Sequence, residues 1–370
     1  MRDSFENSSG RSSRVSRAAV GILLAVVAIA LPASAANAKV PGDFFGVFAE
    51  APAKGEFKDM GKAGFGTYRV PVNWAAIQRT KKGGYDWGQS DYGVYNAAKH
   101  HMRPALVIFG TPGFVHKPSS KGLHPPIGKS ELREWRDFTR ALAARYSPNG
   151  DYFDKTPGID HLPVKSWIMW NEQNNRSNWL PKADPRDYAK LVKSGDRGIS
   201  KVDPKARIVL GGMYGYPRDP KSMKAAKFLK RFYKTRGIAK HFDAINSHPY
   251  GSGVGDVKKQ IRELRSVAKR AGDGNVGLDV GEIGWASSGP KKSESVVGKK
   301  GQAKRLKKGL ELLARKRNAW NVGSVFVYAW KDFRAGQLAC LWCPHAGLVT
   351  KHGKAKPALR AVKKVIRKKG

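Results

Sequence analysis

From Val40 onward the chain alternates between short apolar runs and longer stretches with a one-sided apolar pattern. Eight runs have the length and the β-branched or aromatic content of buried strands: residues 42–50, 64–74, 103–110, 165–174, 206–212, 242–250, 276–285 and 324–330. Between them apolar residues recur at helical spacing with Lys or Arg opposite, as in Leu132, Trp135, Phe138 and Leu142, in Val257, Ile261, Leu264 and Val267, and in Leu306, Leu310 and Leu313. The pattern therefore predicts strands and helices in regular alternation.

Such alternation favours parallel strand pairing. Eight strand–helix units in about 330 residues fit a (β/α)₈ TIM barrel with moderate loops. The alternative is an open doubly wound sheet, which usually has a glycine-rich phosphate turn after its first strand, and this chain has none there. Ser130 and Asp184 are predicted helix starts, and residues 289–304 are expected to form a basic loop.

The first 38 residues have a different character. Arg11, Arg14 and Arg17 precede an apolar core at 18–31, and small residues follow up to Ala38. This order is typical of a secretory signal peptide, whereas an uncleaved membrane anchor is the alternative. We expect a signal peptide at 1–38, one catalytic domain at 39–370 without a membrane span, and a secreted or cell-wall-associated monomer.

The charge balance of the chain predicts a further class of partner. The chain has 69 Lys and Arg against 29 Asp and Glu, a formal net charge of +40. A field of this sign attracts anionic cell-surface polymers or acidic polysaccharides in a salt-dependent way. The alternative is that the charge is a general surface property unrelated to the task. No nucleic-acid-binding module accompanies it, so specific nucleic-acid recognition is not expected.

The two cysteines, Cys340 and Cys343, lie in a C-L-W-C segment. In an oxidising compartment they would close a small disulfide loop. A zinc site with His345 and His352 is a second interpretation, although the usual separation between a cysteine pair and a histidine pair is missing. Two free thiols are the third.

The most informative stretch is 165–174, which reads K-S-W-I-M-W-N-E-Q-N. An apolar run that stops abruptly at a polar cluster is typical of a buried strand that emerges at a surface. Glu172 then lies where the strand leaves the core, and partial desolvation would favour its protonated form. A protonated carboxylic acid can donate a proton. The plainer interpretation is that Glu172 opens a solvated loop.

In a barrel the carboxyl ends of the strands converge on one mouth. Reading only those ends collects polar and aromatic residues: Arg69, Trp74, Asn171, Glu172, His248, Tyr250, Glu282 and Trp330. Glu172 and Glu282 are 110 residues apart, about three units, which predicts that they face each other across the mouth.

Two facing carboxylates suggest glycoside cleavage, one as general acid and the other as nucleophile, about 5 Å apart if configuration is retained. Arg69 would keep Glu282 ionised, and Tyr250 can donate a hydrogen bond to it. Asn171 offers amide hydrogen bonds to a sugar hydroxyl, and Trp330 offers a flat apolar face to a sugar ring.

His248 is a further substrate-binding candidate, or else a hydrogen-bonded core histidine. Trp179, Trp285 and Trp342 are candidates for further sugar subsites, with simple burial as the alternative. Asp279 is expected to be a structural carboxylate at its strand, and His116 is a further candidate for a contact to substrate.

The motifs W-N-E-Q-N at 170–174, S-H-P-Y at 247–250, G-E-I-G-W at 281–285 and Y-A-W at 328–330 resemble the strand ends of clan A glycoside hydrolases, in particular the cellulase-like and β-xylosidase-like branches. Gln173 departs from these families, where proline is commoner. The resemblance implies a (β/α)₈ barrel, a retaining double displacement with Glu172 as acid/base and Glu282 as nucleophile, an oligosaccharide or polysaccharide substrate, and neither metal nor cofactor.

Two other classes of function remain open at this stage. One is a carbohydrate or wall-polymer binding protein that kept the barrel but has little or no activity. Retention of both glutamates with Arg69, Asn171 and Tyr250 argues against it, because binding alone needs neither an acid nor a nucleophile. The other is a polyanion adhesin that depends on the positive charge, whose retention on an anionic wall would vanish in high salt.

Overall fold

A computed structural model describes residues 39–116, 123–334 and 340–370. The predicted signal peptide lies outside the described residues. The strands are β1 Phe45–Phe48, β2 Thr67–Asn73, β3 Arg103–Phe109, β4 Ser166–Met169, β5 Arg207–Leu210, β6 Met213–Tyr214, β7 Ala244–His248, β8 Gly277–Ile283 and β9 Val322–Tyr328. The helices are α1 Lys54–Lys62, α2 Trp74–Ile77, α3 Gly88–Lys99, α4 Lys129–Tyr146, α5 Pro185–Ile199, α6 Ala225–Phe232, α7 Val254–Arg270, α8 Gly298–Trp320 and α9 Pro357–Lys369. Over the described parts of the chain, no helix combines the length and apolar character that a membrane span requires.

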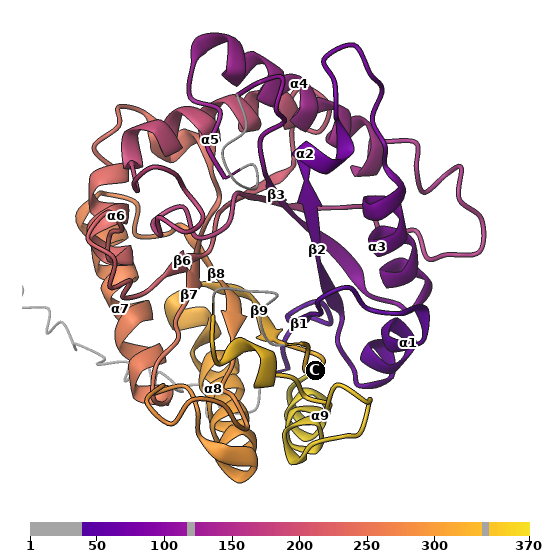
Figure 1. The fold of residues 1–370 in the computed structure, drawn as a ribbon, viewed down its shortest axis with the longest axis vertical. Coiled ribbons are helices and arrows are strands. Elements are labelled where there is room, and N and C mark those ends of the chain that lie inside the picture. Colours follow the sequence, from indigo (N-terminus) through magenta and orange to yellow (C-terminus); the bar gives the residue numbers. More distant parts are fainter. Residues whose placement is uncertain (1–38, 117–122, 335–339) are drawn as a thin grey trace, which may run out of the picture. The chain divides into compact units, whose positions relative to one another are not determined.

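The strands form one closed parallel ring surrounded by helices (Figure 1). The sheet order is β5-β4-β3-β2-β1-β9-β8-β7-β6, and β5 also pairs with β7, which joins the two ends. β5 and β6 are two parts of one strand, separated by Gly211 and Gly212. The predicted (β/α)₈ barrel is therefore confirmed, and the closed ring rules out the open doubly wound sheet.

Two apolar layers hold the ring. The inner layer fills the barrel with side chains from five strands: Ala105, Val107, Ile168, Val209, Ala244 and Phe326. The phenyl ring of Phe326 fits because Gly46 has no side chain; a Cβ at that position would lie 2.4 Å from the ring. The much larger outer layer lies between strands and helices, and it includes the predicted faces of α7 and α8.

One charged pair lies inside the ring with these apolar residues. Arg207, at the start of β5, donates two hydrogen bonds to Asp279 of β8, at 2.7 and 2.9 Å. The Asp279 side chain is 3% exposed, so its carboxylate has lost most of its hydration. The hydrogen bonds from Arg207 compensate for that loss. Asp279 is thus a structural carboxylate, as predicted.

The predicted helix starts were correct in one case and wrong in another. Asp184 is the N-cap of α5, where its carboxylate accepts from the Arg186 and Asp187 amides, and Pro185 is the first helical residue. Ser130, however, does not begin α4. The helix starts at Lys129 because the Glu131 side chain caps it, accepting from the amides of residues 127 and 128.

The expected loop at 289–304 is shorter than predicted. Its last seven residues form the first turns of α8, which begins at Gly298. Lys and Arg are good helix formers, so the basic composition of this segment does not oppose a helix.

We expect Asp279→Asn to lower the free energy of unfolding by about 2 kcal/mol, because Arg207 loses a charged hydrogen-bond acceptor inside the protein. Chemical denaturation measures the change. Asp154→Asn is the control: Asp154 is 75% exposed, and its loss should change stability by less than about 0.5 kcal/mol. Equal, small effects of both substitutions would contradict the structural role of Asp279.

Candidate active site

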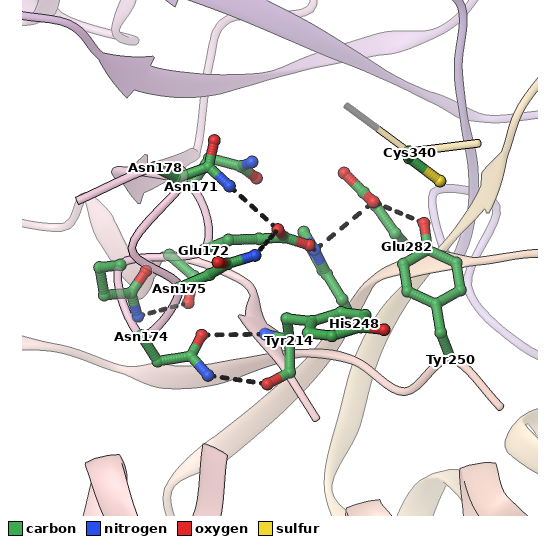
Figure 2. Close-up of polar contacts among 12 residues, drawn as sticks. Asn171, Glu172, Asn174, Asn175, Asn178, Tyr214, His248, Tyr250, Glu282 and Cys340 are labelled. Atoms are coloured by element: carbon green, nitrogen blue, oxygen red, sulfur yellow. Dashed lines mark hydrogen bonds and ion pairs between the residues drawn. The ribbon is translucent and has the colours of Figure 1, made fainter. Parts of the chain in front are cut away.

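Six of the predicted site residues meet at the mouth of the barrel: Arg69, Asn171, Glu172, His248, Tyr250 and Glu282. Arg69 lies within β2, and the others lie at or just after the carboxyl ends of β4, β7 and β8. Figure 2 shows His248 between the two glutamates and Tyr250 directed at Glu282. The convergence of these strand ends is what the sequence predicted.

Glu172 is held by the loop that follows β4. Trp170 and Glu172 have left-handed backbones, with φ of 75° and 48°, so the chain turns sharply as it leaves the strand. The amide of Glu172 donates to Gly212 O at 3.0 Å. Asn178 and Asn175 then donate from Nδ2 to Glu172 Oε2, at 3.0 and 3.4 Å. These two asparagines were not predicted, and only the richness of this loop in asparagine hints at them.

Glu282 is the more deeply buried of the two carboxylates, at 8% exposure. Arg69 Nη1 donates to its Oε1, and the Tyr250 hydroxyl donates to its Oε2 at 2.5 Å. Burial alone would raise the pKa of Glu282, but His248, Arg69 and the Tyr250 hydrogen bond together lower it below its ordinary value. Glu282 is therefore suited to be ionised.

A register irregularity in β8 directs Glu282 into the mouth. Val280 and Ile283 pair with β9 across a shift, and both face the helices. The two residues between them are thereby released from strict strand alternation. Irregularities of this kind often redirect a side chain beside an active site.

Arg69 and Tyr250 are both held as hydrogen-bond donors to Glu282. Arg69 is 4% exposed, and its Nη2 also donates to Asn171 Oδ1 at 2.6 Å. Burial and the charge of Glu282 raise the pKa of Tyr250 well above its usual value, so it stays a hydrogen-bond donor. One guanidinium thus links the residue beside Glu172 to Glu282.

His248 connects the two carboxylates. Its Nδ1 lies 3.0 Å from Glu172 Oε1 and 3.5 Å from Glu282 Oε2, and its side chain is fully buried. The opposite edge of the ring faces Gly212, where a Cβ would lie 1.9 Å from Nε2. Both ring nitrogens therefore face protein, which suits a residue that orients the carboxylates, and a direct contact from His248 to substrate stays a prediction.

One oxygen of each glutamate and one nitrogen of His248 all lie within 4.8 Å of one another. This spacing alone would also suit a divalent metal ion. However, both oxygens of Glu282 already accept hydrogen bonds, one of them from a permanent cation. A second positive charge at this position would be repelled by Arg69, so the donor set fits carboxylate chemistry better than metal binding.

The tryptophans occupy different environments. Trp330 follows β9 and is 3% exposed, so its stacking on a sugar ring stays a prediction. Trp74, Trp179 and Trp285 are each at most 1% exposed and belong to the outer core, which leaves them no open face for a sugar. Trp342 is half-buried, and its ring packs edge-on against Tyr250 with centroids 4.9 Å apart.

The loop that carries Trp342 is closed by a Cys340–Cys343 disulfide. This confirms the first interpretation of the cysteine pair and removes those of a zinc site and free thiols. His116 Nδ1 lies 3.4 Å from Glu131 Oε1 on α4. That pairing gives His116 a structural neighbour.

No family model and no curated protein matches the sequence. Solved structures do match the fold. They include a monomeric β-xylosidase from Caulobacter crescentus (18% identity, TM-score 0.65, covering 88% of this chain and 68% of that one). A family 39 glycoside hydrolase enzyme from Xanthomonas axonopodis matches at 19% identity and TM-score 0.65, covering 90% of this chain and 68% of that one.

A third, a family 39 glycoside hydrolase from Bacteroides cellulosilyticus, matches at 19% identity and TM-score 0.63, covering 90% of this chain and 64% of its own. These neighbours belong to clan A, the group that the strand-end motifs resemble. At such identities the likeness shows a shared (β/α)₈ barrel. This chain spans about two thirds of their length.

We expect Gly212→Ala to lower the free energy of unfolding by about 1–3 kcal/mol, because the added methyl group overlaps the buried His248 ring. Gly84→Ala is the control, since no atom lies within 4 Å of a Cβ at that position. Thermal or chemical denaturation of both variants tests the packing. A Gly212→Ala protein as stable as the control would show that His248 is less tightly held.

Proposed function

We propose that this protein is a retaining glycoside hydrolase that cleaves a β-linked O-glycosidic bond, with Glu172 as acid/base and Glu282 as nucleophile. The observation that carries the proposal is the arrangement of the two carboxylates: one oxygen of each lies within 4.8 Å of the other, and only Glu282 is bonded to an arginine. Retaining enzymes have carboxyl groups about 5–5.5 Å apart, whereas inverting enzymes leave about 6.5–9.5 Å for a water molecule.

The reaction has two steps on this geometry. In the first, ionised Glu282 attacks the anomeric carbon while protonated Glu172 gives its proton to the leaving oxygen, and the glycosidic C–O bond breaks. A glycosyl ester of Glu282 forms. In the second, Glu172 as base takes a proton from water, whose oxygen attacks the same carbon and releases Glu282. Configuration is retained because the carbon is inverted twice.

The surroundings of each carboxylate support this division of roles. Glu282 has a cationic and a phenolic donor, which favour the anion that the first step needs. In the described part of the chain, the Glu172 carboxylate has the side-chain amides of Asn175 and Asn178 and the His248 ring as hydrogen-bond partners, and no arginine or lysine. We therefore assign the acid/base role to Glu172 and the nucleophile role to Glu282.

The substrate class follows from the neighbours and the site. The neighbours are named as β-xylosidases and related glycosidases, and the mouth offers side-chain amides suited to sugar hydroxyls. We therefore propose a β-linked oligosaccharide or polysaccharide, with β-xylosides as the first to test. The basic and apolar order of residues 1–38 and the disulfide at Cys340 support action outside the cytoplasm.

Glu172→Gln and Glu282→Gln should affect different steps. On an unactivated β-xyloside, Glu172→Gln should lower kcat by about 10²- to 10⁴-fold, and Glu282→Gln should leave only background. On a dinitrophenyl β-xyloside, which leaves without protonation, Glu172→Gln should still form the glycosyl-enzyme and show a burst of dinitrophenol. Glu282→Gln should show none.

The matched control is Glu134→Gln on the outer face of α4, which should behave as the parent. Turnover of both active-site variants at the parent rate, across a panel of aryl β-glycosides that the parent hydrolyses, would refute the assignment. A parent without hydrolysis that still binds these sugars would favour the non-catalytic alternative.

Tyr250→Phe should move the acid limb of the kcat/KM pH profile to higher pH. Glu282 must be ionised to attack, so activity is present above its pKa and is lost as the pH falls through it. The Tyr250 hydrogen bond lowers that pKa, and its removal therefore shifts the loss of activity upward. Tyr233→Phe, whose hydroxyl bonds Asp273 on the outer wall, should leave the limb in place. An unmoved limb in Tyr250→Phe would contradict the assignment of Glu282.

A further inference from the structure

The positive charge of this protein is concentrated on one part of the barrel wall. α7 has six Lys and Arg against two Asp and Glu, α8 has nine against one, and α9 has six against none. By contrast, α3, α4 and α5 together have ten against six. α7 contacts α8 and α8 contacts α9, so the three helices form one continuous basic wall (Figure 1).

Two grooves flank α7, the first on the side of α6 and the second on the side of α8. The first has a volume of about 770 Å³, and its basic lining residues are Lys258, Lys259, Arg262 and Arg270. The second, of about 310 Å³, lies between α7 and α8 and has Lys258, Lys308 and Arg315. Each groove also contains one acidic residue, Glu263 in the first and Glu311 in the second. Both grooves are therefore strongly cationic overall.

The cations of these grooves are available to a ligand. Lys258, Arg262, Lys308 and Arg315 are exposed, and none forms an ion pair with any residue in the described part of the chain. The Tyr216 hydroxyl donates to the carboxylate of Glu263, whose two oxygens lie 3.0 and 2.9 Å from it. The neighbouring acid thus has its own partner.

The grooves begin close to the candidate active site. Gly255 and Lys258, in the first turns of α7, line both of them. α7 starts four residues after Tyr250, on the loop that leaves the carboxyl end of β7. From Gly255 to Arg270 the helix rises about 22 Å, which is long enough for several sugar units.

We propose that the grooves flanking α7 bind an acidic polysaccharide, whose carboxylates pair with Lys258, Arg262, Lys308 and Arg315 and whose chain leads from the outer wall to the rim of the mouth. Anion binding by the wall is independent of catalysis, whereas the choice of a polysaccharide rests on the proposed function. Single-stranded nucleic acid is disfavoured because its binding sites present aromatic side chains for base stacking, and the large exposed apolar residues among those described are only Tyr92, Ile127 and Leu341.

The test compares two fourfold variants of the mature protein. The groove variant is Lys258→Gln, Arg262→Gln, Lys308→Gln and Arg315→Gln. The control variant is Arg133→Gln, Arg140→Gln, Arg186→Gln and Arg197→Gln, which removes the same charge from exposed positions of α4 and α5. Circular dichroism and melting curves establish that both are folded. Binding to polygalacturonate is then measured by calorimetry from about 50 to 200 mM salt.

The groove variant should lose affinity about tenfold or more and show a weaker dependence on salt, because fewer counterions are released. The control variant should stay within about threefold of the parent, since charges more than roughly 10 Å from the ligand are screened near 0.1 M salt. Equal losses in both variants, an unchanged groove variant, or tighter binding of duplex DNA than of polygalacturonate would each overturn the proposal.

This binding measurement needs no turnover, so its outcome is separate from that of the proposed function. If the groove variant binds polygalacturonate as the parent does, the groove proposal fails. Hydrolysis of a neutral aryl β-glycoside by the parent protein is unaffected by that result. Conversely, a parent that binds polygalacturonate through the grooves but hydrolyses no glycoside would refute only the catalytic proposal.

Discussion

The structure depends on how buried negative charge is kept inside a closed apolar ring. Glu282 is nearly inaccessible to water, and a carboxylate in that position would be costly without a cation beside it. Arg69 supplies that charge from another strand, and it also holds Asn171 next to Glu172. The same contact therefore stabilises the mouth and sets the separation of the two acids. Removing the guanidinium would disturb both.

An equivalent solution occurs deeper in the ring, where Arg207 pairs with Asp279. Both pairs take their carboxylate from β8 and their arginine from a strand that is not its neighbour in the ring. Between them the interior is filled by small and aromatic apolar side chains, with Phe326 in the space left by Gly46. Two ion pairs thus connect β8 to strands across the barrel, one to β2 and one to β5. The position of Glu282 therefore depends on the packing of the whole ring.

Much of this architecture could be predicted from sequence because it follows from periodicity. Eight apolar runs separated by amphipathic helices favour a closed parallel ring over an open sheet, and a ring brings strand ends such as Glu172 and Glu282 to one mouth. The local details could not be predicted in the same way. The left-handed backbone of Glu172, the irregularity in β8 and the return of Asn175 and Asn178 onto Glu172 depend on loop geometry, which has no short-range pattern. The role of His248 could not be assigned for a similar reason. Only the structure shows that its ring packs against Gly212 with Nδ1 directed at the two glutamates.

The disulfide beside the mouth links the shape of the site to the redox state of its surroundings. Trp342 lies between Cys340 and Cys343 and packs against Tyr250, the phenol that bonds Glu282. With the thiols reduced, the barrel would keep its core, but one aromatic wall of the mouth would lose its covalent tie. Protein made in a reducing bacterial cytoplasm and never oxidised would consequently be folded yet incompletely formed around Tyr250, so the choice of expression compartment determines which form of the site is purified.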